Sequence, residues 1–135
     1  MNKPKKRRYE AIWWNIELPD GWSVRDDPEC TTFTSANLKG VLQLSAYRKD
    51  LDIGDGELFE LADQQPEPEP EPEPVEIGLF TGWCSTHDTK ELRWKKWWLA
   101  RNRTLIFATY NGPVRSADAE IQAAEELLRT LEVRP

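Results

Sequence analysis

Apolar and polar side chains alternate along most of this sequence, which limits the chain to a fold built mainly from half-buried strands. The alternation, bounded by turn residues, predicts the longer strands over residues 9–18, 31–35, 41–47, 75–84, 92–100 and 104–110. Except across residues 49–75, the connections are too short for the crossover that a parallel pair of strands requires. We therefore expect an antiparallel sheet.

The last part of the chain has a helical period instead. Apolar residues recur there at spacings of four, three, four and three, at Ala117, Ile121, Ala124, Leu128 and Leu131. This stripe predicts a long amphipathic helix that packs on the sheet. We expect Ser116 or Asp118 to cap its start and Glu125 to pair with Arg129 one turn later.

A shorter helix is expected over residues 52–63, where apolar residues share one face and Asp52 or Asp55 could act as the N-cap. The predicted fold is therefore an antiparallel β-sheet flanked by a short helix and a long C-terminal helix. This arrangement belongs to the α+β class.

Proline and glutamate alternate over residues 66–74. Because proline lacks an N–H group and fixes φ, this segment is expected to be extended polyproline II. Its prolines recur every second residue, which does not match P-x-x-P docking motifs, so we interpret the segment as a solvated spacer loop. The chain has 135 residues, the usual size of one domain, and we assign a single α+β domain to residues 9–135. Residues 1–8, which carry five basic side chains, are expected to form a disordered tail.

Charge and hydropathy exclude several classes of partner. Eighteen basic against 24 acidic residues give a net charge of −6, which disfavours nucleic acid as a partner. No apolar run approaches the roughly 20 residues of a membrane helix, and the basic start lacks the apolar stretch that a signal peptide requires. We therefore expect a cytoplasmic protein in which Cys30 and Cys84 are free thiols, although two cysteines also allow one disulfide bridge.

Few side chains of this sequence could perform metal or nucleophile chemistry. His87 is the single histidine, and it lies between Cys84 and Asp88. With Cys30 nearby these residues could form a zinc site. Structural zinc sites usually have two closely spaced pairs of ligands, however, and this sequence has only half of such a set. His87 could also act as a base for Cys84, but residues 85–90 are expected to be a polar hairpin loop, in which successive side chains diverge. The sequence thus favours a non-enzymatic protein that needs no metal or cofactor.

A basic, tryptophan-rich hairpin over residues 90–103 reverses the local sign of charge in an otherwise acidic chain. Alternation places Arg93, Lys95 and Trp97 on one face, and a cationic face with an aromatic anchor suits an acidic protein surface or a single nucleic-acid strand. The alternative is a solvent face whose long stems cover Trp97 or neutralise the acidic remainder. Trp13, on the outer face of the first strand, could extend the patch or pack beneath the short helix. The candidate partner-binding residues are therefore Trp13, Arg93, Lys95, Trp97, Arg101 and Arg103.

Several segments resemble a known family. Leu-Pro-Asp-Gly-Trp at residues 18–22 resembles the LPxGW opening of the Mog/PsbP-like families, and residues 41–46 resemble the second strand of small uncharacterised bacterial members. Residues 94–98 and 105–111 are similar to their penultimate hairpin, and the likeness extends over residues 9–133 except for the Pro-Glu segment, which departs from the pattern. The resemblance implies an antiparallel sheet flanked by helices. It also implies a binding role, because relatives engage the Ran GTPase or the photosystem II surface and some bacterial members neutralise toxins.

Three hypotheses for the function follow. The first is a cytoplasmic, non-enzymatic protein-interaction module, such as an immunity or adaptor protein, which binds another protein through a sheet face or loops. The second is a small-molecule-binding or catalytic domain with a pocket lined by Trp13, Trp94 and Trp97, which requires a deep concavity with convergent polar groups. The third is a binder of anionic polymers through the basic hairpin over residues 90–103, which requires an affinity that falls steeply with salt.

Overall fold

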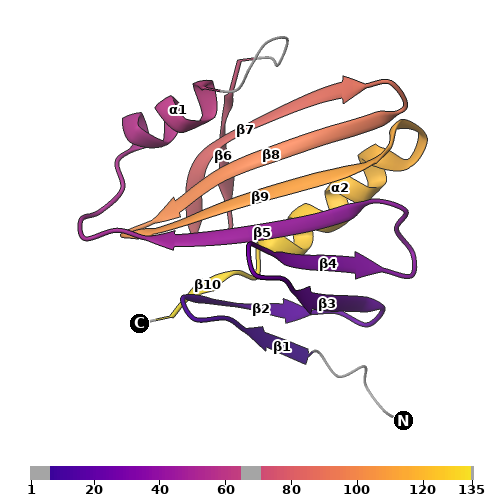
Figure 1. The fold of residues 1–135 in the computed structure, drawn as a ribbon, viewed down its shortest axis with the longest axis horizontal. Helices are drawn as coiled ribbons and strands as arrows, with labels where there is room; N and C mark the ends of the chain where they lie inside the picture. Colours follow the sequence, from indigo (N-terminus) through magenta and orange to yellow (C-terminus); the bar gives the residue numbers. More distant parts are fainter. Residues whose placement is uncertain (1–6, 65–70, 135) are drawn as a thin grey trace.

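A computed structural model describes residues 7–64 and 71–134 of the chain. Within these ranges the elements are, in order, β1 (Arg7–Glu10), β2 (Trp14–Leu18), β3 (Trp22–Asp26), β4 (Thr31–Ser35), β5 (Val41–Arg48), α1 (Asp55–Asp63), β6 (Glu73–Ile77), β7 (Phe80–Thr89), β8 (Leu92–Arg101), β9 (Thr104–Pro113), α2 (Val114–Leu128) and β10 (Glu132–Val133). A seven-stranded sheet has the order β3-β4-β5-β9-β8-β7-β6, and a three-stranded sheet has the order β1-β2-β10 (Figure 1). Each neighbouring pair is antiparallel, so the predicted α+β fold is confirmed.

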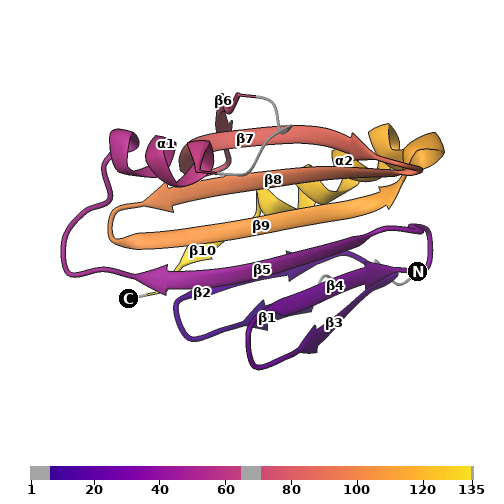
Figure 2. The ribbon, with the colours of Figure 1, turned by 45° about the horizontal axis from the view of Figure 1, so that its top comes forward.

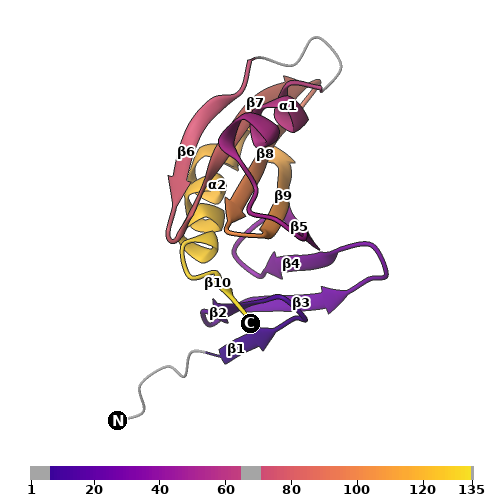
Figure 3. The same cartoon turned by 90° about the vertical axis from the view of Figure 1, so that its left-hand side faces the viewer.

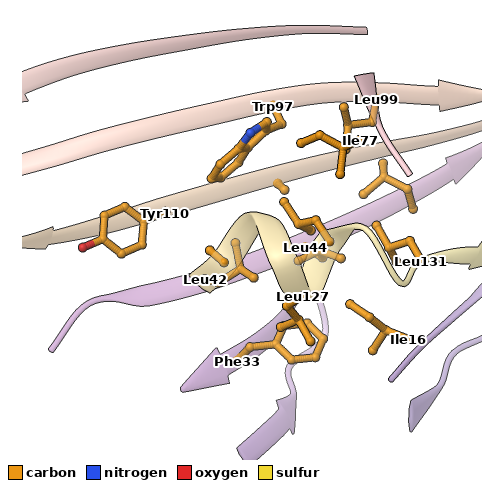
Figure 4. Packing of buried hydrophobic residues seen from close by; sticks show 14 of the residues in the cluster. Ile16, Phe33, Leu42, Leu44, Ile77, Trp97, Leu99, Tyr110, Leu127 and Leu131 are labelled. Carbon is orange, nitrogen blue, oxygen red and sulfur yellow. The ribbon is translucent and has the colours of Figure 1, made fainter. Parts of the chain in front are cut away.

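Different elements cover the two faces of the seven-stranded sheet (Figures 2 and 3). α2 and the three-stranded sheet lie on one face, and α1 lies on the other. The main core lies on the first face and contains, among others, Ile16, Phe33, Leu42, Leu44, Ile77, Trp97, Leu99, Tyr110, Leu127 and Leu131 (Figure 4). A smaller cluster beneath α1 joins Leu58 and Ala62 to Trp98 and Ala100 of β8. β8 is therefore apolar on both of its faces, because a helix covers each of them.

The predicted apolar stripe of α2 is buried against the sheet. The helix begins at Val114, directly after β9, and Pro113 occupies the N-cap position without a side-chain hydrogen bond. The expected cap by Ser116 or Asp118 is therefore wrong, because the helix starts before both residues.

The start and environment of α1 also differ from the prediction. The helix begins at Asp55 after Gly54, and no side chain caps it, so the expected cap by Asp52 or Asp55 is wrong. Neither helix in the two described ranges is long and apolar enough to cross a membrane.

The N-terminal segment is a hairpin rather than the single strand predicted over residues 9–18. The Ala11 N–H donates to the Trp14 carbonyl (2.8 Å) and closes a turn between β1 and β2. The predicted end of the tail at residue 8 is also wrong, because β1 begins at Arg7, whose guanidinium donates to the Trp22 carbonyl. Residues 1–6 of the predicted tail lie outside the described residues.

A second hairpin replaces the strand predicted over residues 75–84 and the polar loop predicted over residues 85–90. β6 and β7 are joined through Gly78, which adopts a φ of 58°. A Cβ atom at this position would lie 2.5 Å from the Arg129 carbonyl oxygen, so glycine is required. β7 then stays paired with β8 as far as Thr89, and this ladder makes the polar segment a strand.

The Pro-Glu spacer predicted over residues 66–74 lies partly outside the described residues, which omit 65–70. Its last two residues, Glu73 and Pro74, open β6 and are therefore strand rather than spacer. β6 is an edge strand of the seven-stranded sheet, and an edge is where a proline, which has no N–H to donate, is tolerated.

A buried carboxylate joins α2 to the turn between β4 and β5. Glu120, which is 4% exposed, accepts hydrogen bonds from the N–H groups of Lys39 (3.1 Å) and Gly40 (2.8 Å). The Tyr110 hydroxyl donates to the same carboxylate at 2.9 Å. Burial alone would raise the pKa of the Glu120 carboxyl, but these donors outweigh burial and hold the pKa below its usual range. A Cβ atom at Gly40 would lie 2.6 Å from the Tyr110 ring, so the turn requires glycine there.

Candidate functional site

An open cleft lies between the two sheets, at the end of the molecule where several turns meet. Its walls are the β1–β2 turn, the β3–β4 turn, the middle of β5 and the segment that follows β10, and its volume is about 550 Å³. In Figure 1 this is the end where the β1–β2 turn lies beside the C-terminus. A volume of a few hundred Å³ is typical of sites that bind ligands.

Aromatic side chains of the β1–β2 hairpin form one wall of the cleft. Tyr9, Trp13 and Trp14 line it, and Ile12 stands exposed at its rim. The Arg48 guanidinium lies over the Trp13 ring, 5.7 Å from its centroid. Trp13 thus belongs to this cleft, and the expectation that it extends the basic hairpin or packs beneath the short helix is wrong. The turn after β1 carries Trp13 to the opposite side of the sheet from α1.

Two carboxylates of the β3–β4 turn are held in place by hydroxyl donors. Asp26 accepts hydrogen bonds from the Tyr9 hydroxyl and from Thr31 Oγ1 (3.2 Å). Asp27 accepts one from Thr32 Oγ1 at 3.3 Å and one from Nε of Arg25, also at 3.3 Å, so its carboxylate is already paired with one guanidinium. Burial and then the neighbouring Asp26 raise the pKa of Tyr9 to about 12, so its hydroxyl remains a donor at neutral pH. A carboxylate has about four acceptor sites, so both side chains retain capacity for a further donor.

Glu10, Glu29 and Arg134 complete the charged rim. The Arg134 guanidinium donates to the Ala11 carbonyl, and its Nη2 atom lies 3.9 Å from Oε2 of Glu10. The exposed Glu29 is fixed through its backbone, because the Ser45 hydroxyl donates to the Glu29 carbonyl at 3.0 Å. The lining residues therefore include four carboxylates and one guanidinium. Two further guanidinium groups contact the lining, Arg25 at Asp27 and Arg48 at Trp13, so the cleft has a small excess of negative charge.

This arrangement suits the binding of a positively charged group better than it suits a reaction. Carboxylates attract a cation, and aromatic walls hold its apolar stem or its charged head. Cys30 also lines the cleft, with Thr32 Oγ1 at 4.0 Å from its sulfur, but a hydroxyl is not a base that activates a thiol. Over the described ranges, no group of three or more His, Cys, Asp and Glu side chains could hold a metal ion.

Arg93, a predicted partner-binding residue, is paired within the fold. Its guanidinium lies 2.8 Å from the Asp88 carboxylate and 2.6 Å from the Asp118 carboxylate. The hydrogen bond from Arg93 holds the pKa of the Asp88 carboxyl below its usual range. Strand pairing places Asp88 directly opposite Arg93. The positive charge of Arg93 therefore pairs with a carboxylate of the neighbouring strand and is not directed at a partner protein.

Trp97 is buried, so the interpretation of this residue as a surface anchor is wrong. It is 0% exposed, and its indole N–H donates to Glu125 Oε2 at 3.1 Å. The Lys95 ammonium lies 3.3 Å from the same carboxylate and 5.6 Å from the centroid of the Trp97 ring. The observed arrangement is the alternative in which a long charged stem covers Trp97. The Glu125 side chain faces β8, and these contacts replace its predicted pairing with Arg129.

The six candidate residues are therefore distributed over three places. Trp13 lines the cleft, and Arg93, Lys95 and Trp97 lie between β8 and α2. Arg101 donates from Nη1 to the Leu79 carbonyl at 3.1 Å, and Arg103 is exposed at the neighbouring β8–β9 turn.

The predicted pocket between three tryptophans does not form. Trp94 and Trp97 are three residues apart on one strand, so their side chains lie on opposite faces of the sheet. Trp94 is stacked near His87, with ring centroids 6.4 Å apart, while Trp13 lies in the cleft.

The structure does not assemble Cys30, Cys84 and His87 into a metal or nucleophile site. Both thiols are free. Cys30 precedes β4 and Cys84 lies on β7, with three strands between them, which separates them by about 19 Å at the usual strand spacing. Cys84 and His87 point to opposite faces of β7, so the proposed base does not reach the thiol.

Sequence reasoning missed the carboxylates of the cleft. Acidic residues in a turn are usually solvated, so residues 26, 27 and 29 taken alone do not predict a binding site. The acidic run of the β3–β4 turn was a visible signal, but nothing local indicated that it faces the aromatic turn after β1.

Comparisons with known proteins establish the fold. No family model matches the chain, and no curated protein matches it. A crystal structure from Bacteroides thetaiotaomicron is similar with a TM-score of 0.67 and 19% identity over 91% of this chain, which spans 46% of that protein's length. LpqN of Mycobacterium tuberculosis, described as involved in cell envelope biogenesis, is similar with a TM-score of 0.55 and 10% identity, over 99% of this chain and 93% of LpqN. Cyanobacterial PsbP of Synechocystis sp. PCC 6803 has a TM-score of 0.50 and 11% identity, over 98% of this chain and 95% of PsbP. At these identities the likeness shows the fold alone, and it is Mog/PsbP-like.

Proposed function

We propose that this chain, with its Mog/PsbP-like fold, is a non-enzymatic protein-interaction module that receives a positively charged segment of its partner in the cleft between the two sheets. The observation that supports this most is the gathering of four carboxylates around the aromatic wall of one open cleft. An immunity or adaptor role is the biological setting that we propose for such a module.

The cleft offers both parts of a recognition site for a lysine or arginine side chain. The exposed Glu29 and the fixed carboxylates of Asp26 and Asp27 would accept hydrogen bonds from the charged head. Trp13 and Ile12 would pack against the apolar stem. The Arg48 guanidinium lies over the Trp13 ring, 5.7 Å from its centroid, so this ring already holds one charged head inside the molecule.

The charge of the chain beyond its basic first eight residues favours the same class of partner. Beyond residue 8 the sequence has 13 basic and 24 acidic residues. Such an excess of negative charge attracts a basic partner over long range and accelerates the encounter.

A titration with an extended peptide of alternating lysine and threonine would test the proposal, with the intrinsic tryptophan fluorescence as the signal. The Asp27→Asn, Glu29→Gln double variant removes two charges from the rim, and Glu126→Gln removes one from the exposed face of α2 as a matched control. An exposed ion pair contributes about 0.2–1 kcal/mol, so the double variant, which removes two carboxylates, should bind the peptide roughly two- to thirtyfold more weakly. Glu126→Gln should bind as the wild type does, and added salt should weaken binding to the wild type.

Two results would overturn the proposal. The first is a loss of binding free energy in Glu126→Gln that is half or more of the loss in the double variant, which would mean that only the overall charge matters, because the control removes one charge and the double variant two. The second is binding of free argininamide as tight as that of the peptide, which would make a small cation, and not a protein segment, the occupant of the cleft.

A further inference from the structure

Apolar side chains also gather far from the cleft, in a groove between α1 and the outer face of the seven-stranded sheet. The groove has a volume of about 280 Å³, and its apolar wall consists of Tyr47, Ile53, Leu61 and Leu105. Tyr47 and Leu105 are cross-strand partners on β5 and β9, and Leu61 is on α1. The groove exists because α1 packs through Leu58 and Ala62 on β8 and leaves the outer face of β5 uncovered.

Two large apolar side chains at this groove are exposed to solvent. Of the residues that line it, Tyr47 is 54% exposed and Leu61 is 37% exposed. Single exposed apolar residues are ordinary, but neighbouring ones around a concave surface are typical of a site that binds another chain.

The surroundings of the groove are acidic. Glu57 and Glu60 line it, and residues 50–63 also contain Asp50, Asp52, Asp55 and Asp63. Lys49 is the basic residue of the lining, and its ammonium pairs with the Glu57 carboxylate. An occupant must therefore combine an apolar stripe with a basic face.

The strand pairing decides which conformation such an occupant has. β5 is bonded to β9 over its whole length and to β4 through residues 42–44, so an added strand could pair only with the four residues 45–48 of β5. A second copy of this chain would bring the same acidic surface to the groove, and like charges would oppose that contact. A helix needs no free edge, and the nine residues of α1 form a wall about 13 Å long, which is enough to contact two turns of a helix.

We propose that this groove binds a basic amphipathic helix of a partner protein, with its apolar stripe on Tyr47, Leu61 and Leu105. Apolar residues at i, i+3, i+4 and i+7 of that helix enter the groove, and its lysine or arginine residues face the carboxylates of α1. This site is independent of the cleft, because it lies on the opposite face of the seven-stranded sheet.

The test uses the full chain and a labelled peptide of about 14 residues with leucine at the helical spacing and lysine elsewhere. A peptide of the same composition in scrambled order is the control for charge. Fluorescence anisotropy should show binding of the amphipathic peptide at least about tenfold tighter than binding of the scrambled peptide. Leu61→Gln should weaken binding about tenfold, as expected when one buried leucine contact is lost. Leu92→Gln, at a site 40% exposed on the far end of β8, should leave binding unchanged.

Tyr47→Ser provides a second variant on the sheet, where a loss of helix structure in α1 is not a concern, and it should also weaken binding. Equal binding of the two peptides would overturn the proposal, since charge alone would then account for the affinity. An equal loss in Leu61→Gln and Leu92→Gln would overturn it as well. So would a dimer in sedimentation experiments that Leu61→Gln converts to a monomer, because the occupant would then be a second copy. The Asp27→Asn, Glu29→Gln variant should bind the helical peptide normally, which separates this result from the test of the cleft.

Discussion

The buried carboxylate of Glu120 allows a prediction whose magnitude follows from the contacts around it. The change is Glu120→Gln, which keeps the shape of the side chain and removes its charge. The carboxylate receives the N–H groups of Lys39 and Gly40 at 3.1 and 2.8 Å and the Tyr110 hydroxyl at 2.9 Å. A glutamine has one acceptor oxygen, so its NH₂ group must face at least one of the two backbone donors.

The expected loss combines two effects. Hydrogen bonds to a charged group contribute about 1.5–3 kcal/mol, and a buried donor left unpaired costs about 1–3 kcal/mol. Because the glutamine oxygen retains part of the bonding, we expect the free energy of unfolding to fall by about 3 kcal/mol. That is a large part of the roughly 5–15 kcal/mol that stabilises a typical domain.

Urea unfolding of the wild type and of Glu120→Gln at neutral and acidic pH measures this loss. The pKa of the Glu120 carboxyl is depressed in the folded chain, so its contribution is complete above the usual glutamate pKa of about 4.3. The contribution disappears as the pH falls through the folded pKa, where the carboxylate takes up a proton. The difference between the two proteins should therefore be largest at neutral pH and should shrink on acidification.

Glu126→Gln, on the exposed face of the same helix, is the matched control and should change stability by less than about 0.5 kcal/mol. A loss in Glu120→Gln no greater than in this control would refute the reasoning. So would a difference from the wild type that stays constant from neutral pH to well below pH 4, because the charge of Glu120 would then not be the cause.

Three further predictions concern packing and titration. Gly82→Ala should lower the free energy of unfolding by about 3 kcal/mol or more in urea unfolding, because its Cβ would lie 1.8 Å from the Trp98 carbonyl oxygen and overpacking already costs about 1–3 kcal/mol. Burial raises the pKa of the Cys84 thiol, so a thiol-specific dye at neutral pH should label Cys30 first and Cys84 only after unfolding; equal rates in the native protein would contradict this. Spectrophotometric titration should show Tyr9 ionising at about 12, and ionisation near the ordinary value of about 10 would mean that Tyr9 is neither buried nor next to a carboxylate.

The strands and the helix with a regular apolar period could be predicted, because the period indicates which side chains share a face. The alternation over residues 92–100 and 104–110 predicts β8 and β9 nearly complete. The apolar stripe predicts α2 and its buried face, although its last member, Leu131, lies beyond the end of the helix at Leu128. In both cases the information is local, since each residue's neighbours along the chain define the pattern.

Turn positions were less predictable, because the alternation continues through them. The segment before Trp14 keeps its alternation, yet a turn forms there and joins β1 to β2. The polar residues after Cys84 favour a loop when taken alone, and they are a strand because β8 extends beside them and supplies ladder partners such as Arg93 opposite Asp88. A pairing partner is remote in sequence, so local composition does not reveal it.

The sequence by itself determined that this chain is an antiparallel α+β domain closed by a long amphipathic helix, because periods and short connections leave few other ways to bury the apolar faces. Only the tertiary structure decided which tryptophan is covered. The alternation along β8 places Trp94 and Trp97 on opposite faces of the sheet. It does not indicate that α2 packs over Trp97 and buries this side chain in the core. Only the tertiary structure, too, brought the β1–β2 turn, the acidic β3–β4 turn and the C-terminal segment together around one cleft. These segments share no sequence pattern, and the packing of one sheet on the other places them side by side.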